Sequence, residues 1–471
     1  MTKTLSVLLL AALLAAGMPE PAGAEPDARI ITEQCTVLLN GQPADAALTD
    51  GSEETFLQYD SAEITVSAPE PIGAVYVVFD RTPSAWTLLC GAEKNLSCGT
   101  NGFLHEYQPV EDESVTEVTL CFDTDVSVAD LFILSRGDRP AFVQAWRPAE
   151  GPCDLLLLAC HADDDQLFFA GAIPDAVARG AEVQVCYFTN HWSLHTRPHE
   201  LLNGLWACGL DRYPVIGPFP DVRRVSEEQT ALEDLEALGF SYKDMAAQQT
   251  ELLRRFRPQV VLGHDRNGEY GHGAHMLSAH VLLDAVLAAA QPDAFPESAE
   301  AFGVWDVPKV YLHLLEQDPI DFEIDRPLAR FNGRTAFSVS QSAFLCHISQ
   351  QITRYRTWLL GNEEEPAADS SVFPPEYSPR RFGLWRSLVG KDTVKTDFYE
   401  HITLRGAEGS PAAQPTETPM PTPTATPAET ASPAPPADGS GRSPFPVLPT
   451  VLMLLSLIAA GAGSRFLQRT K

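Results

Sequence analysis

Histidines and carboxylates are concentrated in a short stretch that directly follows an apolar run. Residues 161–165 read His-Ala-Asp-Asp-Asp, and residues 154–160 before them read DLLLLAC. An apolar run of this length is typical of a strand buried on both faces of a parallel sheet. In open α/β sheets, ligands bind beyond the carboxyl ends of such strands. Because clustered carboxylates are costly to bury unless a cation or substrate engages them, the stretch predicts a metal site.

A second cluster of the same kind lies further along the chain. Residues 259–263 predict another buried strand, followed by a helical segment that opens with the sequence YGHGAH. His272 and His275 are three apart, so they share one face of a first helical turn, and His161 and Asp164 have the same spacing. Two strand ends of this type can bring four side chains to one ion. Zinc accepts His nitrogen and Asp oxygen, and a catalytic zinc keeps three protein ligands plus water.

Strands alternate with helices from residue 152 onward. Apolar runs predict strands at 154–160, 182–189, 259–263 and 308–315, and periodic segments predict helices at 197–208, 242–256, 273–290 and 338–360. A further helix from about Asp165 is expected to end or kink at Pro174, and residues 361–408 are expected to be irregular. The alternation predicts a doubly wound, mostly parallel, Rossmann-like sheet in an α/β domain over residues 150–405.

The segment between residues 28 and 148 has a different, β-rich texture. Short strand-like pieces separated by turn residues occur at 64–67, 74–79, 115–122 and 131–134. This pattern predicts an all-β sandwich over residues 28–148. The run Ala-Leu-Thr-Asp-Gly-Ser at 47–52 resembles the opening of discoidin-like, galactose-binding-type jelly rolls. That resemblance implies either a glycan-binding module or a spacer.

The two ends of the chain predict export and membrane attachment. Residues 1–24 combine an early lysine, an apolar core and an Ala-Gly-Ala cleavage signal, which predicts a signal peptide. Residues 410–444 are rich in Pro, Thr and Ala, which predicts a disordered stalk. Residues 446–464 are apolar and uncharged, which predicts one transmembrane helix, and the positive charges of residues 465–471 put that tail in the cytoplasm. The alternative is a hydrophobic tail lost on processing. The folded domains are expected outside a bacterial cell.

Charge and cysteine content limit the classes of partner. The formal net charge is −30, from 33 Lys plus Arg and 63 Asp plus Glu, which disfavours nucleic acid as a partner. Nine cysteines are too few for a disulfide scaffold, and no CxxC zinc knuckle occurs. Cys90 and Cys98 could pair across a loop, whereas Cys160 and Cys186 lie on apolar strands and are expected to be small buried hydrophobes. The oligomeric state is left open.

Four motifs, in order, resemble those of the PIG-L (LmbE-like) family of zinc-dependent N-deacetylases. The family's A-H-P-D-D-E motif is similar to Cys-His-Ala-Asp-Asp-Asp at 160–165, and its G-H-x-D-H motif is similar to Gly-His-Gly-Ala-His at 271–275. A family helix that opens with Arg and Glu and ends at Cys-Gly resembles residues 197–210, and a late motif resembles residues 343–350. The resemblance covers residues 150–405 and implies an LmbE-like fold.

The resemblance also implies the roles of the site residues. One zinc ion per chain, or another divalent metal, would be held by His161, Asp164 and His275, with water at the open position. Asp163 would be the general base that takes a proton from that water. His272 would donate to the oxyanion of the tetrahedral intermediate or to the leaving amine.

Three further residues would bind the substrate. Tyr270 would reach the carbonyl oxygen, whereas Arg197 and Glu200 would line the sugar pocket, the first through charge-assisted hydrogen bonds and the second through hydroxyl groups.

The chain also departs from the family motifs at three positions. Ala162 replaces a Pro, Asp165 replaces a Glu, and Ala274 replaces an Asp that would orient an imidazole. Asp265 could supply the carboxylate that Ala274 lacks.

These expectations combine into one leading hypothesis and two alternatives. The leading hypothesis is a cell-surface hydrolase acting on linear amide C–N bonds, which removes acetyl from N-acetylglucosamine-type amino sugars in glycans or glycoconjugates by attack of a metal-bound water. The first alternative is a non-catalytic glycan-binding protein with a degenerate deacetylase domain. The second is a metal-dependent amidase of another small substrate. Metal content would separate the leading hypothesis from the first alternative.

Overall fold

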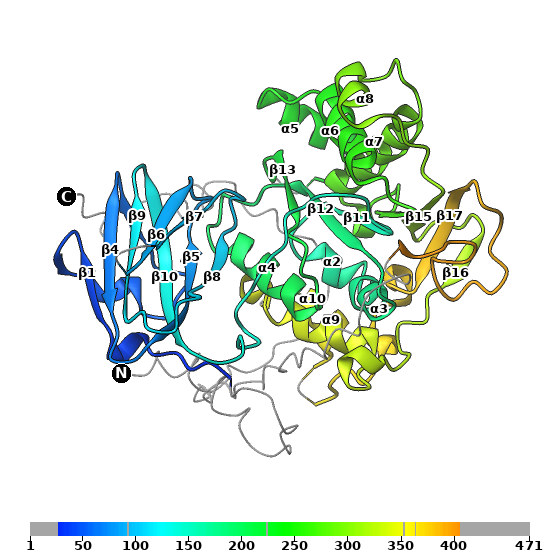
Figure 1. Cartoon of the computed structure of the whole chain (residues 1–471). Helices are drawn as coiled ribbons and strands as arrows, with labels where there is room; N and C mark the ends of the chain where they lie inside the picture. The colour runs from blue at the N-terminus through cyan, green and yellow to red at the C-terminus, as the bar shows by residue number, and fades with distance from the viewer. Residues whose placement is uncertain (1–26, 92–93, 223–224, 352–353, 363, 406–471) are drawn as a thin grey trace, which may run out of the picture.

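The computed structural model describes residues 27–91, 94–222, 225–351, 354–362 and 364–405 (Figure 1). The predicted signal peptide, stalk, transmembrane helix and cytoplasmic tail all lie outside these residues. Among the helices in the described ranges, none is long and apolar enough to cross a membrane. The described chain folds as a β-sandwich followed by an α/β unit (Figure 1).

The first unit consists of two antiparallel sheets packed face to face. The six-stranded sheet has the order β2 (Gln42–Pro43), β1 (Thr36–Leu39), β4 (Ala62–Ser67), β9 (Glu117–Phe122), β6 (Trp86–Cys90), β7 (Lys94–Cys98). The four-stranded sheet has the order β3 (Leu57–Tyr59), β10 (Val126–Ser135), β5 (Ile72–Phe79), β8 (His105–Pro109). Buried and more exposed residues alternate along β4 and β9, as expected for strands with one face on a core.

The second unit is built on a seven-stranded sheet. Its order is β13 (Val215–Phe219), β12 (Val183–Thr189), β11 (Leu155–Ala159), β14 (Val260–Gly263), β15 (Lys309–His313), β17 (Arg381–Ser387), β16 (Pro319–Asp321). The first five strands are parallel, and β17 and β16 are antiparallel to their neighbours. Every residue of β11 and β12 is buried, which explains the unbroken apolar sequence of β11 and the mainly apolar sequence of β12. The doubly wound, mostly parallel sheet predicted from the alternation is therefore present.

Helices cover both faces of this sheet (Figure 1). One face carries α5 (Glu228–Ala237), α6 (Tyr242–Phe256), α7 (Gly273–Ala289) and α8 (Pro296–Phe302). The other face carries α2 (Asp164–Leu167), α3 (Ala172–Ala178), α4 (Arg197–Ala207), α9 (Ala336–Phe344) and α10 (Tyr355–Leu360). The strand order reverses direction between β11 and β14, so the carboxyl ends of these two strands border the crevice where ligands bind in such sheets.

Four expectations about secondary structure and cysteines were wrong. Pro174 neither ends nor kinks a helix. The helix α2 stops before it, and the chain turns at Gly171 (φ 81°). Pro174 then lies in the first turn of α3, where its missing N–H is tolerated. The predicted helix 338–360 is two helices, α9 and α10. The segment expected to be irregular contains β17, which gains its partners only from β15 and β16. Cys90 and Cys98 are not bonded to each other, because they lie opposite Lys94 and Trp86 in the β6–β7 pair.

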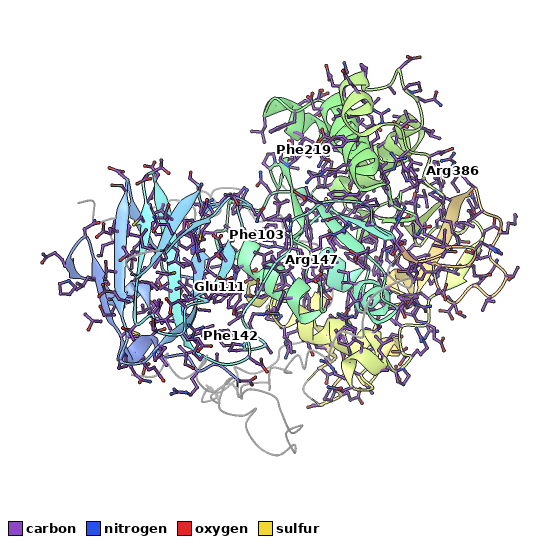
Figure 2. The ribbon with its side chains drawn as sticks, in the orientation of Figure 1. Phe103, Glu111, Phe142, Arg147, Phe219 and Arg386 are labelled. Carbon is purple, nitrogen blue, oxygen red and sulfur yellow. The ribbon has the colours of Figure 1, made fainter. Side chains whose placement is uncertain are left out.

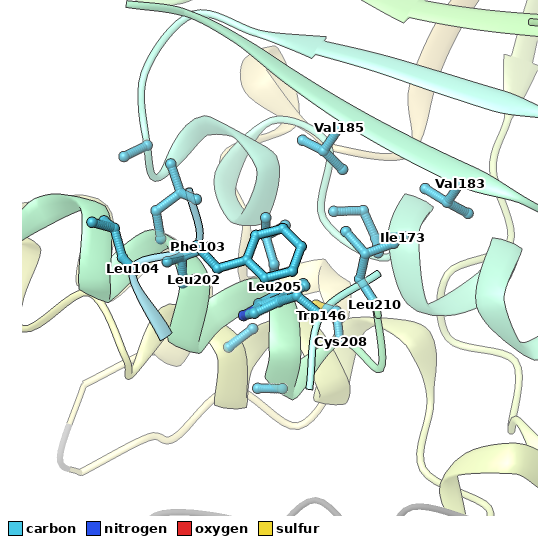
Figure 3. Packing of buried hydrophobic residues seen from close by; sticks show 14 of the residues in the cluster. Phe103, Leu104, Trp146, Ile173, Val183, Val185, Leu202, Leu205, Cys208 and Leu210 are labelled. Atoms are coloured by element: carbon cyan, nitrogen blue, oxygen red, sulfur yellow. The ribbon is translucent and has the colours of Figure 1, made fainter. Parts of the chain in front are cut away.

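The two units share a buried interface. The Tyr213 hydroxyl accepts a hydrogen bond from the Leu104 backbone N–H at 3.1 Å, and the Phe103 and Tyr213 rings lie 4.7 Å apart. Phe103 and Trp146 pack among apolar side chains of α4 and of the strands beside it (Figure 3). Arg147, labelled in Figure 2, forms an ion pair with Asp211 at 2.8 Å. One continuous hydrophobic core therefore runs from the sandwich into the face of the α/β sheet that carries α4.

Candidate metal and catalytic site

Three predicted metal ligands converge at the end of β11. His161 Nδ1 lies 3.1 Å from Asp164 Oδ2 and 3.0 Å from His275 Nε2, and the third side of the triangle, from His275 Nε2 to Asp164 Oδ2, is 3.3 Å. Donor atoms about 2.0–2.1 Å from a tetrahedral zinc ion are ~3.3 Å apart, so the spacing fits such an ion. All three side chains are buried, and two nitrogens with one oxygen form a donor set that zinc accepts.

Local structure explains why these side chains meet. His161 follows β11 directly, and its backbone N–H donates to Asp164 Oδ2 at 2.6 Å, which fixes the carboxylate of the residue that begins α2. His275 lies in the first turn of α7, which follows the neighbouring strand β14. The predicted pairing of two strand ends therefore holds, and it is the sheet order that brings the two clusters together.

A buried carboxylate that the sequence reasoning missed, Glu269, holds this group of imidazoles. It accepts hydrogen bonds from the Nδ1 atoms of three buried histidines: His275 at 2.7 Å, His313 at 2.8 Å and His264 at 2.9 Å. Burial alone would raise the pKa of Glu269, but the contacting histidines hold that pKa well below its ordinary value. Since Nδ1 of His275 carries the proton given to Glu269, its Nε2 presents a lone pair to the donor triangle.

Glu269 therefore does what Asp265 was expected to do. Asp265 does not contact His275; its Oδ1 accepts from the backbone N–H of Asn267 at 3.0 Å and so closes a local turn. The loss of the family carboxylate at Ala274 is compensated by a residue six positions before His275. A carboxylate in the turn just ahead of the second cluster is the signal that could have identified it.

His264 is a structural member of the site. Its Nε2 accepts the Cys160 backbone N–H at 2.9 Å, and its Nδ1 donates to Glu269. Both ring nitrogens are thus engaged by hydrogen bonds that tie the end of β14 to the end of β11. Cys160 is itself buried, and burial raises the pKa of its thiol.

Asp163, the predicted general base, lies beside the triangle and is held by Arg197. The Arg197 guanidinium donates to Asp163 Oδ1 at 2.9 Å, and both side chains are largely buried. Arg197 was expected to line the sugar pocket; its position in the structure makes it the partner of the base. An ion pair of this kind fixes the direction of the carboxylate.

Glu200, predicted to line the sugar pocket, contacts Ser349 in the structure. Both of its carboxylate oxygens accept hydrogen bonds from Ser349, one from the backbone N–H at 2.7 Å and one from the hydroxyl at 2.6 Å. The residue is buried, and its contact with a sugar stays a prediction. These bonds tie α4 to the segment between α9 and α10, where the helix predicted over 338–360 is interrupted.

His272 and Tyr270 lie beside His275. His272 caps α7 by accepting the Ala274 backbone N–H on Nδ1 at 3.3 Å, so Nε2 carries the proton when the ring is neutral. Its ring stacks on His275, with centroids 4.5 Å apart. Burial raises the pKa of the Tyr270 phenol far above the physiological range, so this hydroxyl stays protonated. Both residues can therefore act as hydrogen-bond donors, the chemistry predicted for them.

The backbone of Tyr270 is in the left-handed region, with φ 48°. A non-glycine residue in this region costs about 1–3 kcal/mol and is retained where the surroundings fix it. Here the Tyr270 ring lies between the rings of His275 and Tyr355, with centroid distances of 5.7 Å and 5.5 Å.

A second pair that sequence reasoning missed, Asp221 and His191, completes the site. Asp221 Oδ1 lies 3.5 Å from His161 Nε2, and its Oδ2 lies 3.7 Å from His191 Nδ1. His191 Nε2 accepts the Ala162 backbone N–H at 2.9 Å, which holds the loop that carries His161. Asp221 follows β13, whose sequence Val-Ile-Gly-Pro-Phe gives no clear strand signal. The strand-end argument therefore could not be applied to it.

Asp165 has no part in the donor triangle. Its side chain is buried, and burial followed by the nearby Asp163 and Asp164 charges raises its pKa well above the ordinary value. It accepts from the Gln166 amide at 2.6 Å.

Comparison with known proteins agrees with this geometry. Residues 156–286, which contain both clusters, match the PIG-L family, described as GlcNAc-PI de-N-acetylase. The chain therefore contains a PIG-L family domain.

Curated relatives carry related names. The chain is 40% identical over 96 residues to 1D-myo-inositol 2-acetamido-2-deoxy-alpha-D-glucopyranoside deacetylase 2 of Saccharopolyspora erythraea, covering 20% of this chain and 33% of that protein. It is 37% identical over 201 residues to the deacetylase of the same substrate from Rhodococcus erythropolis, covering 36% of this chain and 63% of that protein. The chain thus spans less than two thirds of these relatives. Among solved structures, N,N'-diacetylchitobiose deacetylase from Pyrococcus horikoshii is similar, with TM-score 0.32, 15% identity and coverage of 43% of this chain and 72% of that one.

Proposed function

We propose that this protein is a zinc-dependent N-deacetylase that removes acetyl from an N-acetylglucosamine-type amino sugar. The observation that carries the proposal is the triangle of His161 Nδ1, Asp164 Oδ2 and His275 Nε2, with sides of 3.0–3.3 Å, beside the carboxylate of Asp163. The deacetylase names of the family and of the curated relatives support the reaction and the amino-sugar class.

The residues around the triangle have complementary chemistry. A bound zinc ion would supply a Lewis acid that lowers the pKa of water and polarises an amide carbonyl. Asp163, directed by Arg197, would accept a proton from the attacking water. His272 Nε2–H and the Tyr270 hydroxyl would donate to the carbonyl oxygen as it gains charge, and His272 would then protonate the leaving amine.

The alternative of a degenerate, non-catalytic domain has two motivations, which are Ala274 at the position of a missing carboxylate and the added β-sandwich. Glu269 supplies a carboxylate at 2.7 Å from His275 Nδ1, which weakens the first motivation. The contact of Arg197 with Asp163 and the hydrogen bond that His272 Nδ1 accepts from Ala274 support the catalytic proposal.

The activity can be tested with the purified full-length chain. Released acetate and new primary amine would be measured with N-acetylglucosamine and its glycosides as substrates. We expect hydrolysis that a chelator abolishes and zinc restores. Absence of amine release with zinc-loaded, folded protein across these sugars would refute the proposed activity, and hydrolysis of simple acetamides alone would favour the alternative small-amide substrate.

We also propose that the enzyme works at a bacterial cell surface on glycans or glycoconjugates. Support for this location comes from the composition of residues 1–24, 410–444 and 446–464. Protease added to intact cells should release an active soluble fragment cut within residues 410–444. Complete protection of the protein until cells are lysed would refute the location while leaving the catalytic proposal intact.

A further inference from the structure

A second group of potential metal ligands lies where the sandwich meets α4. It consists of Glu53, in the loop before β3, His105, the first residue of β8, and His199, in the first turn of α4. The ligand atoms of these three side chains all lie within 4.8 Å of one another. None of the three belongs to the donor triangle of the first site.

The two imidazoles face each other inside the interface. His105 Nε2 lies 2.9 Å from His199 Nδ1 and 3.8 Å from Glu53 Oε1. The two histidines are 2% and 0% exposed and the Glu53 side chain is 33% exposed, so the imidazole pair is interior and the carboxylate lies at its edge. Two nitrogens and one carboxylate oxygen match the donor types of protein-bound zinc.

Two of the three ligands, His105 and Glu53, are oriented by a partner behind them. The Tyr76 hydroxyl contacts His105 Nδ1 at 2.7 Å, on the far side of the ring from His199. The Asn203 amide donates to both oxygens of Glu53, at 3.1 and 3.2 Å. Metal-binding histidines and carboxylates usually have such outer partners, because these fix the direction of the ligand lone pair.

The charges of the cluster favour an ion over a simple hydrogen bond. A hydrogen bond between two neutral imidazoles would explain the 2.9 Å contact, but it would give Glu53 no positive charge. In the described chain, the only ion-pair partner of Glu53 is His105. A divalent cation would accept both imidazole lone pairs and balance the carboxylate.

We propose that Glu53, His105 and His199 form a second site for a divalent transition metal, with zinc the best match, which clamps the sandwich onto α4. Two ligands come from the sandwich and one from the α/β unit, so the ion would join the two units directly. The clamped helix begins at Arg197, the partner of Asp163. The metal would thus stabilise the end of α4 that orients the proposed base. This site does not depend on the deacetylase proposal.

The test counts zinc ions in the full-length protein. Wild type, Glu53→Gln, His105→Gln and the control His280→Gln would be dialysed against zinc and analysed by mass spectrometry of the metal. His280 is a partly exposed histidine that pairs with Glu228 at 2.8 Å, so its variant removes a histidine–carboxylate pair outside the cluster. We expect the two cluster variants to bind one zinc fewer than wild type and the control.

Two further measurements separate this proposal from misfolding and from the first site. Glu53→Gln is nearly isosteric and should keep its circular dichroism spectrum, and His275→Ala should lose a different zinc ion, so that a double variant loses both. Anomalous diffraction at the zinc edge from wild-type crystals should show a peak between His105 and His199. Equal zinc content in all variants, or no peak at this position in zinc-loaded crystals, would overturn the second site.

Discussion

Replacing Glu269 with glutamine would test whether this residue is the carboxylate on which the metal site depends. The carboxylate has two acceptor oxygens: Oε2 contacts His275 and His264, and Oε1 contacts His313 and the backbone N–H of Asp265. A glutamine side chain of the same shape has one acceptor and one amide group that only donates. If its oxygen takes the Oε2 position, its NH2 group must face the Asp265 N–H. The substitution therefore removes the negative charge and leaves one side of the network mismatched.

The size of the effect follows from these contacts. Loss of a partner that orients a metal-binding histidine costs about 10–100-fold in metal affinity or activity, equivalent to ~1.4–2.7 kcal/mol. Hydrogen bonds to a charged group exceed neutral ones by about 1 kcal/mol each, so three histidine contacts predict a loss of ~3 kcal/mol in the free energy of unfolding. We therefore expect Glu269→Gln to need about 10–100-fold more zinc for half-maximal turnover.

The assay is reconstitution of the metal-free enzyme with zinc, followed by amine release, together with chemical denaturation. Amine release depends only on zinc in the catalytic site, so this measurement does not count any other bound zinc. Glu228→Gln is the matched control, because it removes a carboxylate that pairs with His280 Nδ1 at 2.8 Å on a more exposed part of the protein. The control should behave as wild type. If Glu269→Gln is half-activated at the wild-type zinc concentration and is as stable as wild type, the orienting role assigned to Glu269 is wrong.

Three other substitutions test the remaining assignments. Asp163→Asn should keep the catalytic zinc but lower turnover about 10²–10⁴-fold, and loss of metal instead would make Asp163 a ligand. Glu200→Gln should lower the free energy of unfolding by ~1–2 kcal/mol with little change in KM, because it loses one Ser349 hydrogen bond, whereas a large rise in KM without destabilisation would restore its predicted contact with the sugar. The third test concerns His347, a buried histidine between α9 and α10. Burial lowers its pKa to about 4 in the folded state, against 6.5 for an exposed histidine, so its contribution to the free energy of unfolding should be complete above pH 6.5 and fall by ~3 kcal/mol as the pH drops to 4. His347→Gln should flatten that dependence by about one proton, and denaturation curves with the wild-type pH slope would contradict the assignment.

The sequence was most informative where a buried strand runs directly into a cluster of polar residues. The strands β11 and β14 are continuous apolar runs, and each is followed by a cluster of potential ligands, at a few residues from β11 and after an intervening turn from β14. The spacing predicted that His161 and Asp164 share a site with His272 and His275, whereas the choice of three ligands among them came from the resemblance to the PIG-L family. The same logic failed for Asp221, because β13 contains Gly217 and Pro218 and gains its strand conformation by pairing with β12.

Partners that meet only in three dimensions could not be predicted. Arg197 and Glu200 open one helix, and their residue types suit either a sugar or an ion pair. Their partners, Asp163 and Ser349, are 34 and 149 residues away, so the choice between these roles depends on tertiary packing. β17 is a similar case, because its antiparallel partner β15 lies far from it in the sequence.

The electrostatics of the site explain why so many carboxylates can share one sheet edge. Asp163 is paired with Arg197, and Glu269 is surrounded by imidazoles. Asp164 faces three histidines, with His161 Nδ1 at 3.1 Å, His275 Nε2 at 3.3 Å and His264 Nε2 at 3.4 Å from its Oδ2. The facing nitrogens of His161 and His275 would be lone pairs when an ion is bound. A divalent ion in the triangle would therefore balance the charge of this buried carboxylate.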